Sequence, residues 1–260
     1  MGACLIMATF TAMGARLGCN LPTTPIQYIA QRWGRFFALV MGLSGCFVCA
    51  GFQFGNNLGV TVAMQGVFPN TPGWMWPILF TVLSLLFLFL AKQLYQMLEK
   101  FMMVLVAAMI IAFFANLFWT GVDLPKLAQG FIPRGLSGGE VAIAGAMLAT
   151  TFSAMAAFYQ AYLVQAKGWT RENIGTAIGD AWIGIAILGT ISLVIMISAA
   201  QALHGQVEDV ESIGQLSGQL SAILGSWALY IFSFGLGAAA FSSFIANALI
   251  GGSLLADGLG

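Results

Sequence analysis

The stretch FFALVMGLSGCFVCAGFQFGNNLGVTVAMQGVF, residues 36–68, contains no Asp, Glu, Lys or Arg. A helix needs about 20 mostly apolar residues to cross the hydrocarbon core of a bilayer, and this stretch exceeds that length. It lacks the apolar–polar alternation in runs of about ten residues that a membrane β-strand shows. The stretch therefore predicts a transmembrane helix.

Similar apolar stretches fill most of the remaining sequence, and we predict helices at residues 2–17, 74–90, 101–122, 141–165, 180–203 and 222–256. Sixty per cent of the 260 residues are hydrophobic and 7% are charged, against roughly 25% charged in a soluble domain. So few charges cannot cover the surface of a soluble fold of this size. We predict an all-α polytopic membrane protein with about seven transmembrane helices, in contact with the lipid bilayer.

The charged residues orient these helices. The connections at residues 16–35, 92–100 and 167–180 hold every Lys and Arg except Lys126 and Arg134. Short loops rich in Lys and Arg stay cytoplasmic, so we expect these connections to face the cytoplasm and residues 204–215 to face outward. The net charge is zero and there is no basic run, which makes nucleic acid an unsuitable partner. No obligatory protein partner is evident.

Both ends of the chain bear on its domain organisation. The orientation places Met1 at the outer face with no preceding span, and the chain stops at Gly260 directly after a glycine-rich apolar run. We therefore expect residues 1–260 to be one transmembrane domain that lacks a first helix and further C-terminal helices. The alternative is a complete seven-helix protein.

Amides are the polar exceptions inside residues 36–68. Gln53, Asn56 and Asn57 are spaced by three and four residues, which places them on one face of a helix. They either bond across a helix interface or line a neutral, hydrated ion path. Gly51, Gly55 and Gly59 repeat every four residues in the same helix, the small-residue pattern that lets helices approach closely.

A second polar exception, Thr150-Thr151-Phe152-Ser153-Ala154-Met155, lies midway along residues 141–165. Thr and Ser hydroxyls can bond back to carbonyls and bend a helix, and helices broken at mid-membrane expose carbonyls to cations in transporters. The pattern alone is weak, because Ser and Thr are common where helices pack and no Pro or Gly marks a break.

Enzymatic motifs are missing from the sequence. Cys46 and Cys49 form a C-x-x-C pattern inside an apolar span, where we expect them to pack rather than to bind zinc or undergo redox chemistry. His204 is the only histidine and lies at the end of a predicted helix, so the sequence offers no histidine for a catalytic triad. We predict that the protein is not an enzyme and needs no cofactor.

Several short segments resemble the Nramp family of divalent-metal transporters, in an order and spacing that cover the whole chain. They are Ala15-Arg16-Leu17-Gly18, Asn57-Leu58-Gly59, Gly130-Phe131-Ile132-Pro133-Arg134, Asp180, His204-Gly205 and Phe241-Ser242-Ser243. The resemblance implies the LeuT-type fold of two inverted five-helix repeats, here incomplete, with this chain covering helices two to eight. The family's first-helix Asp-x-x-Asn metal ligands have no counterpart in the chain.

Departures from the family pattern indicate the substrate. The resemblance places the family's sixth-helix Met-Pro-His at Ser153-Ala154-Met155, its third-helix Asp and Glu at Gln53 and Asn56, and a seventh-helix amide at Ser192. A soft thioether ligand and three titratable groups are thereby lost. These changes look like the Nramp-related magnesium transporters, because Mg²⁺ is a hard cation that takes oxygen ligands.

We therefore expect Mg²⁺, and in second place Mn²⁺, to enter by alternating access across the cytoplasmic membrane without proton coupling. The resemblance implies a metal site at Thr151, Phe152, Ser153 and Ala154, and an ion path lined by Gln53, Asn56, Asn57, Met155 and Ser192. The alternatives are a proton-coupled Mn²⁺/Fe²⁺ transporter, a LeuT-type carrier of amino acids, and a membrane remnant that transports nothing.

Overall fold

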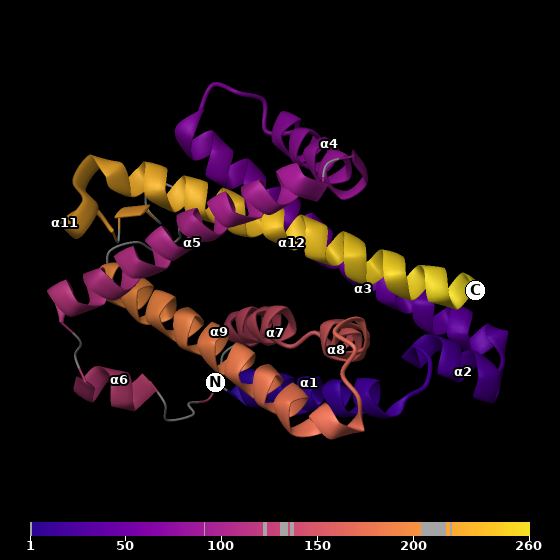
Figure 1. Cartoon of the computed structure of the whole chain (residues 1–260). Coiled ribbons are helices and arrows are strands. Elements are labelled where there is room, and N and C mark those ends of the chain that lie inside the picture. The colour runs from indigo at the N-terminus through magenta and orange to yellow at the C-terminus, as the bar shows by residue number, and fades with distance from the viewer. Residues whose placement is uncertain are drawn as a thin grey trace. The chain divides into compact units, whose positions relative to one another are not determined.

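A computed structural model describes residues 2–90, 92–121, 124–130, 135, 138–203, 217–218 and 220–260. In these ranges every regular element is an α-helix or a short 3-10 helix, and no strand occurs (Figure 1). The prediction of an all-α protein is confirmed.

The apolar stretches predicted from sequence are helical. Five segments in the described part of the chain are long and apolar enough to cross a membrane: Gly2–Asn20, Arg35–Val67, Gly138–Ala166, Arg171–Gln201 and Gly225–Leu259. Shorter apolar segments cover Met75–Leu86 and Met103–Trp119. Large apolar side chains stay exposed on these helices, such as Phe47 at 73% and Phe118 at 85%. Exposed apolar surface of this extent marks a surface for lipid, so the protein is a multi-pass membrane protein.

The helices are, in chain order, α1 (Gly2–Asn20), α2 (Pro25–Trp33), α3 (Arg35–Val67), α4 (Met75–Leu90), α5 (Lys92–Thr120), α6 (Leu124–Gly130), α7 (Gly138–Thr151), α8 (Ala154–Ala166), η1 (Arg171–Asn173), α9 (Ile174–Leu203), α11 (Ser221–Leu224), η2 (Gly225–Trp227) and α12 (Ala228–Leu259).

The prediction of a connection at residues 92–100 is wrong, because α5 begins at Lys92. This segment contains good helix formers and no Gly or Pro, and hydropathy marks where the bilayer ends rather than where a helix ends.

The connection predicted at residues 16–35 contains α2, which sequence analysis did not find. Thr24 precedes the helix, and its hydroxyl accepts a hydrogen bond from the backbone N–H of Gln27 at 3.4 Å. Pro25 follows in the first turn, where its missing N–H costs nothing. The helix ends at Gly34, which has φ 98° and ψ 163°. Only glycine adopts this region of backbone conformation readily.

Replacing Gly34 by Ala should lower the free energy of unfolding by about 1–3 kcal/mol. A Cβ at Gly34 would have no neighbour within 4 Å in the described structure, so backbone strain alone causes the loss. The measurement is the thermal unfolding midpoint of the detergent-solubilised protein. Gly51→Ala is the matched control, since Gly51 is helical and its Cβ would also meet nothing within 4 Å. Equal midpoints for the two variants would contradict the prediction.

The chain forms two compact units. Unit 1 comprises Met1–Phe52, Arg134–Thr190 and Asn247–Gly260, and unit 2 comprises Gln53–Pro133 and Ile191–Ala246. In unit 1 one apolar cluster joins α1, α8 and α9 through Ala15, Val164 and Ala177. A second cluster joins α2, α3 and α12 through Ile26, Ala38 and Leu254, all at most 1% exposed.

The core of unit 2 is built around the first part of α12. Val60 and Met64 of α3 pack with Phe244 in one apolar cluster. Met109 and Phe113 of α5 contribute to another, which also includes Val194 of α9 and Phe232 of α12. Apolar contacts at these clusters thus hold the helices of this unit together.

Candidate functional site

A break interrupts the predicted helix at residues 141–165. The helix α7 ends at Thr151, α8 begins at Ala154, and Phe152 and Ser153 between them are not helical. Ser153 has an extended backbone, with φ −116° and ψ 108°. The broken helix that the Thr and Ser residues suggested is therefore present, without Pro or Gly.

Hydroxyl groups on both sides of the break explain it. The Thr151 hydroxyl donates to the Met147 carbonyl at 2.8 Å, and the Thr150 hydroxyl donates to the carbonyls of Ala146 and Met147 at 3.1 Å each. Such bonds compete with the helical ladder. Ser153 then caps the next helix, because its side chain accepts from the backbone N–H of Ala156 at 3.2 Å.

The break exposes backbone oxygens. The N–H of Phe152 bonds to the carbonyl of Leu148 at 2.8 Å, and the Ser153 carbonyl accepts from Ala157 at 3.0 Å. Among the described residues, no backbone hydrogen bond outside the helices is made to the carbonyl of Thr151 or Phe152. These carbonyls lie at the C-terminal end of α7, which carries the negative end of a helix dipole. The arrangement is able to offer oxygen ligands to a cation.

Contacts with α1 fix the position of α8. A Cβ at Gly14 would lie 2.1 Å from the carbonyl oxygen of Ala157, and one at Gly18 would lie 2.5 Å from that of Ala161. Only glycine permits this approach of two backbones. Beside the break, the rings of Phe10 and Phe152 meet edge to face with centroids 5.2 Å apart.

The predicted stripe of Gly51, Gly55 and Gly59 does not make such contacts. A Cβ at Gly51 or Gly55 would meet no atom within 4 Å in the described structure. At Gly59 the nearest neighbour would be Ala240 Cβ at 3.8 Å, an ordinary contact. The prediction of close helix approach at this stripe is wrong for the described residues, because the glycine face meets no helix backbone there; on α3 the close approach occurs at Gly42, where a Cβ would lie 2.6 Å from the Leu254 carbonyl oxygen.

The amide group on α3 lies in unit 2. Gln53 Oε1, Asn56 Nδ2 and Asn57 Oδ1 are buried and have no hydrogen-bond partner among the described residues. Buried polar atoms are nearly always hydrogen-bonded, so each exception needs an explanation. Water is able to satisfy such atoms where a path is hydrated.

The other predicted residues have different surroundings. Ala154 begins α8 and is exposed, as is Thr151, while Met155 packs against the apolar cluster of Ile26, Ala38 and Leu254. Ser192 is exposed on α9 in unit 2. The break belongs to unit 1 and the amide group to unit 2. Residues 131–134 and 204–215, which carry the Pro-Arg segment, His204 and the outer connection, lie outside the described residues.

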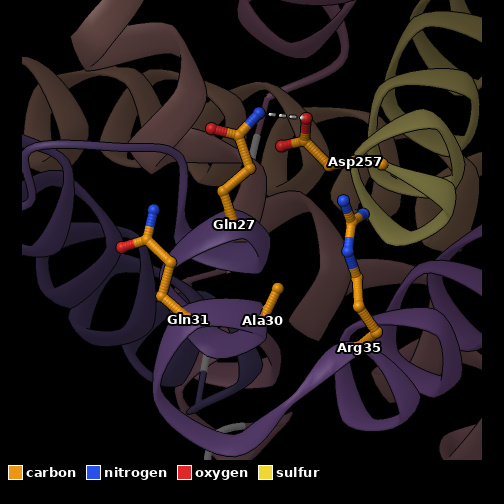
Figure 2. Close-up of a pocket in the computed structure, with 6 residues that line it drawn as sticks. Gln27, Ala30, Gln31, Arg35 and Asp257 are labelled. Carbon is orange, nitrogen blue, oxygen red and sulfur yellow. Dashed lines mark hydrogen bonds between the residues drawn. The ribbon is translucent and has the colours of Figure 1, made fainter.

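Asp257, near the end of α12, was not identified from sequence as a site residue. Together with Gln27, Ala30, Gln31 and Arg35 it lines a pocket of about 280 Å³ in unit 1 (Figure 2). Figure 2 shows the Gln27 amide directed at the Asp257 carboxylate, and this hydrogen bond measures 3.0 Å. No group of three or more His, Cys, Asp or Glu side chains suited to a metal ion occurs in the part of the chain that the structure describes.

Comparison with known proteins gives one positive result. The family model described as natural resistance-associated macrophage protein-like, Nramp, matches residues 1–260. A search of curated proteins finds no match to this chain.

Proposed function

Because this chain belongs to the Nramp family, whose members are transporters of divalent metal ions rather than enzymes, we propose that it transports Mg²⁺, with Mn²⁺ as a secondary cargo. We place it in the Nramp-related magnesium branch of the family and in the cytoplasmic membrane. The fold we propose is the LeuT type, and transport proceeds by alternating access.

The break between α7 and α8 carries this proposal. Discontinuous helices at mid-membrane let transporters present carbonyls to cations, and the carbonyls of Thr151 and Phe152 accept no backbone hydrogen bond outside the helices of the described chain. The Ser153 hydroxyl uses one lone pair to cap α8 and retains another. Thr151, Phe152 and Ser153 thus supply oxygen donors, with Ala154 as the first residue of the half-helix beyond them.

The donor set supports a hard cation. Oxygen ligands suit Mg²⁺, whereas a thioether favours softer ions. Met155 follows the break directly, but its side chain packs against an apolar cluster of unit 1. A site of carbonyls and a hydroxyl is able to accept Mg²⁺ that keeps several of its waters, which this ion releases reluctantly.

The amides of α3 support transport without proton coupling. Gln53, Asn56 and Asn57 cannot gain or lose a proton at physiological pH. Their buried, unpartnered polar atoms suit a hydrated path, in which water satisfies them. Ser192 on α9 would add a further hydroxyl to that path.

Mg²⁺ flux into proteoliposomes that contain the full-length protein should proceed without acidification of the lumen. The reason is that the residues of the path are amides and hydroxyls, which carry no proton with the ion. A Mg²⁺-sensitive dye and a pH-sensitive dye, both enclosed in the lumen, report the two processes together. Protein-free liposomes are the control.

Three outcomes would contradict the proposal. Acidification in proportion to Mg²⁺ entry would indicate a proton-coupled transporter. Competition by amino acids but not by Mn²⁺ would indicate an organic-solute carrier. Absence of Mg²⁺ flux, with the protein folded and inserted, would remove Mg²⁺ as the cargo.

A further inference from the structure

A single carboxylate joins three helices at one end of unit 1. The Tyr162 hydroxyl of α8 donates to Asp257 Oδ2 at 2.8 Å, and the Gln27 amide of α2 donates to Asp257 Oδ1 at 3.0 Å. The Thr24 hydroxyl, which caps α2, also donates to Asp257 Oδ2. Asp257 itself is on α12. We call Thr24, Gln27, Tyr162 and Asp257 the Asp257 cluster.

The surroundings of this cluster strengthen its bonds. Tyr162 and Phe158 pack against the apolar cluster formed by Ile26, Ala38 and Leu254. Low polarity around a hydrogen bond makes it stronger electrostatically, and bonds to a charged acceptor are stronger than neutral ones. The bonds that Thr24 and Tyr162 donate to Asp257 are partly buried and gain from these surroundings, whereas the bond from Gln27 is exposed.

A second set of bonds holds the same end of α8 to α1. The Gln165 amide nitrogen donates to the carbonyls of Gly18, Leu21 and Thr23, at 3.4, 3.3 and 2.9 Å. These carbonyls lie at and just beyond the end of α1, where backbone oxygens lack helical partners. These polar contacts add to the close backbone approach of α8 to α1 at Gly14 and Gly18 and to the apolar packing of Val164, so their loss loosens the end of α8 without separating the two helices.

We propose that Asp257 is a positioning residue that latches α8, the half-helix beyond the break, to α2 and α12, and that the latch opens during transport. The connections at residues 16–35 and 167–180 are rich in Lys and Arg, so we expect this end of unit 1 to lie at the cytoplasmic side. Release of Tyr162 from Asp257 frees the end of α8 that is remote from Ser153. The role in transport rests on the proposed function, but the latch itself is testable without any ion.

Cys19 is a native reporter for this opening. It is 7% exposed, it belongs to the apolar cluster that Val164 of α8 completes, and it lines a pocket of about 420 Å³ together with Thr24, Gln27 and Gln165. Loosening of the bonds between the end of α8 and residues 18–24 uncovers its thiol. A protein that retains Cys19 and carries Ala at Cys4, Cys46 and Cys49 reports this movement as a rate of modification by a membrane-impermeant thiol reagent.

Tyr162→Phe and Asp257→Asn should each raise the rate of Cys19 modification at least about tenfold. A hydrogen bond to a charged group contributes more than the free energy of a tenfold change in an equilibrium constant. Tyr159→Phe is the matched control, because Tyr159 stacks on Tyr162 with centroids 5.4 Å apart and its hydroxyl is not part of the cluster. In this variant Cys19 should be modified at the wild-type rate.

A second pair of variants and a second thiol separate latch opening from unfolding. Thr24→Ser keeps the hydroxyl, so Cys19 should be modified slowly in this variant. Thr24→Val removes the hydroxyl, so Cys19 should be modified fast. A Cys49-only protein reports unfolding, since Cys49 is 6% exposed and lies on α3 against Gly251 of α12. Its rate should stay low in every latch variant.

Unchanged Cys19 modification in Tyr162→Phe and Asp257→Asn would overturn the latch, even if the wild-type protein transports Mg²⁺. Equal acceleration at Cys19 and Cys49 would also overturn it, because the variants would then be unfolding the unit. Selective acceleration at Cys19 supports the latch whether or not Mg²⁺ flux is found, so failure of the transport proposal is recognised separately.

Discussion

Gly14→Leu should abolish the accumulation of folded protein. The Cβ alone would lie 2.1 Å from the carbonyl oxygen of Ala157 and 3.3 Å from its carbonyl carbon. The obstacle is backbone of α8 rather than the end of a flexible side chain, so no rotamer change relieves the clash. Overpacking in a tight core costs about 1–3 kcal/mol where neighbours can adjust, and here the two helices must separate. We expect no monodisperse peak on size-exclusion chromatography.

Gly18→Leu should behave in the same way, since its Cβ would lie 2.5 Å from the Ala161 carbonyl oxygen and 2.8 Å from Ala161 Cα. Gly51→Leu is the control, because Gly51 is on an equally apolar helix and its Cβ would meet no described atom within 4 Å. A normal peak for Gly14→Leu would contradict the prediction. Loss of the peak for Gly51→Leu would also contradict it, because the effect would then not depend on the close contact between α1 and α8.

The helices of this protein were predictable from sequence because the bilayer imposes a simple requirement. Backbone polar groups in lipid must be satisfied within the segment, so each long apolar run has to be a helix. Cytoplasmic and outer connections carry no such requirement. The helix α2 and the first turns of α5 were missed for that reason, since both are polar enough to look like connections.

Close helix approach was predicted at the wrong glycines for a different reason. Gly14 and Gly18 share the spacing of Gly51 and Gly55, and spacing places residues on one face of a helix without saying what that face meets. The structure shows that the first pair meets α8 and that the second pair meets nothing within 4 Å in the described residues.

The candidate site was partly visible in the sequence. Thr150, Thr151 and Ser153 suggested a bent helix, and their hydroxyl bonds are local, within four residues along the chain. The Asp257 cluster was invisible because its partners are distant: Tyr162 is 95 positions away and Gln27 is 230. Only the fold brings such residues together.

Replacing Ser153 by Trp should reduce Mg²⁺ flux to the level of protein-free liposomes. The substitution removes the α8 cap, at a cost of about 1 kcal/mol, and places an indole where the ends of α7 and α8 meet. The ring would cover the open carbonyls of Thr151 and Phe152, which the proposal assigns to the cation. Because Ser153 is only partly buried, we expect the indole to be accommodated at the break without unfolding unit 1.

Two matched variants define the effect. Ser153→Thr keeps a hydroxyl that is able to cap the helix and should retain flux close to that of the wild type. Ser44→Trp introduces the same bulk at an exposed serine of α3, and it should also retain flux. Loss of flux in Ser44→Trp would mean that tryptophan on these helices is harmful at any position.

The initial rate of Mg²⁺ entry into proteoliposomes, compared between the full-length wild-type protein and Ser153→Trp at equal amounts of inserted protein, is the most direct test. The account predicts flux above background for the wild type and background flux for Ser153→Trp. Equal flux in the two proteins would contradict it, because Mg²⁺ would then cross the membrane without passing the break between α7 and α8.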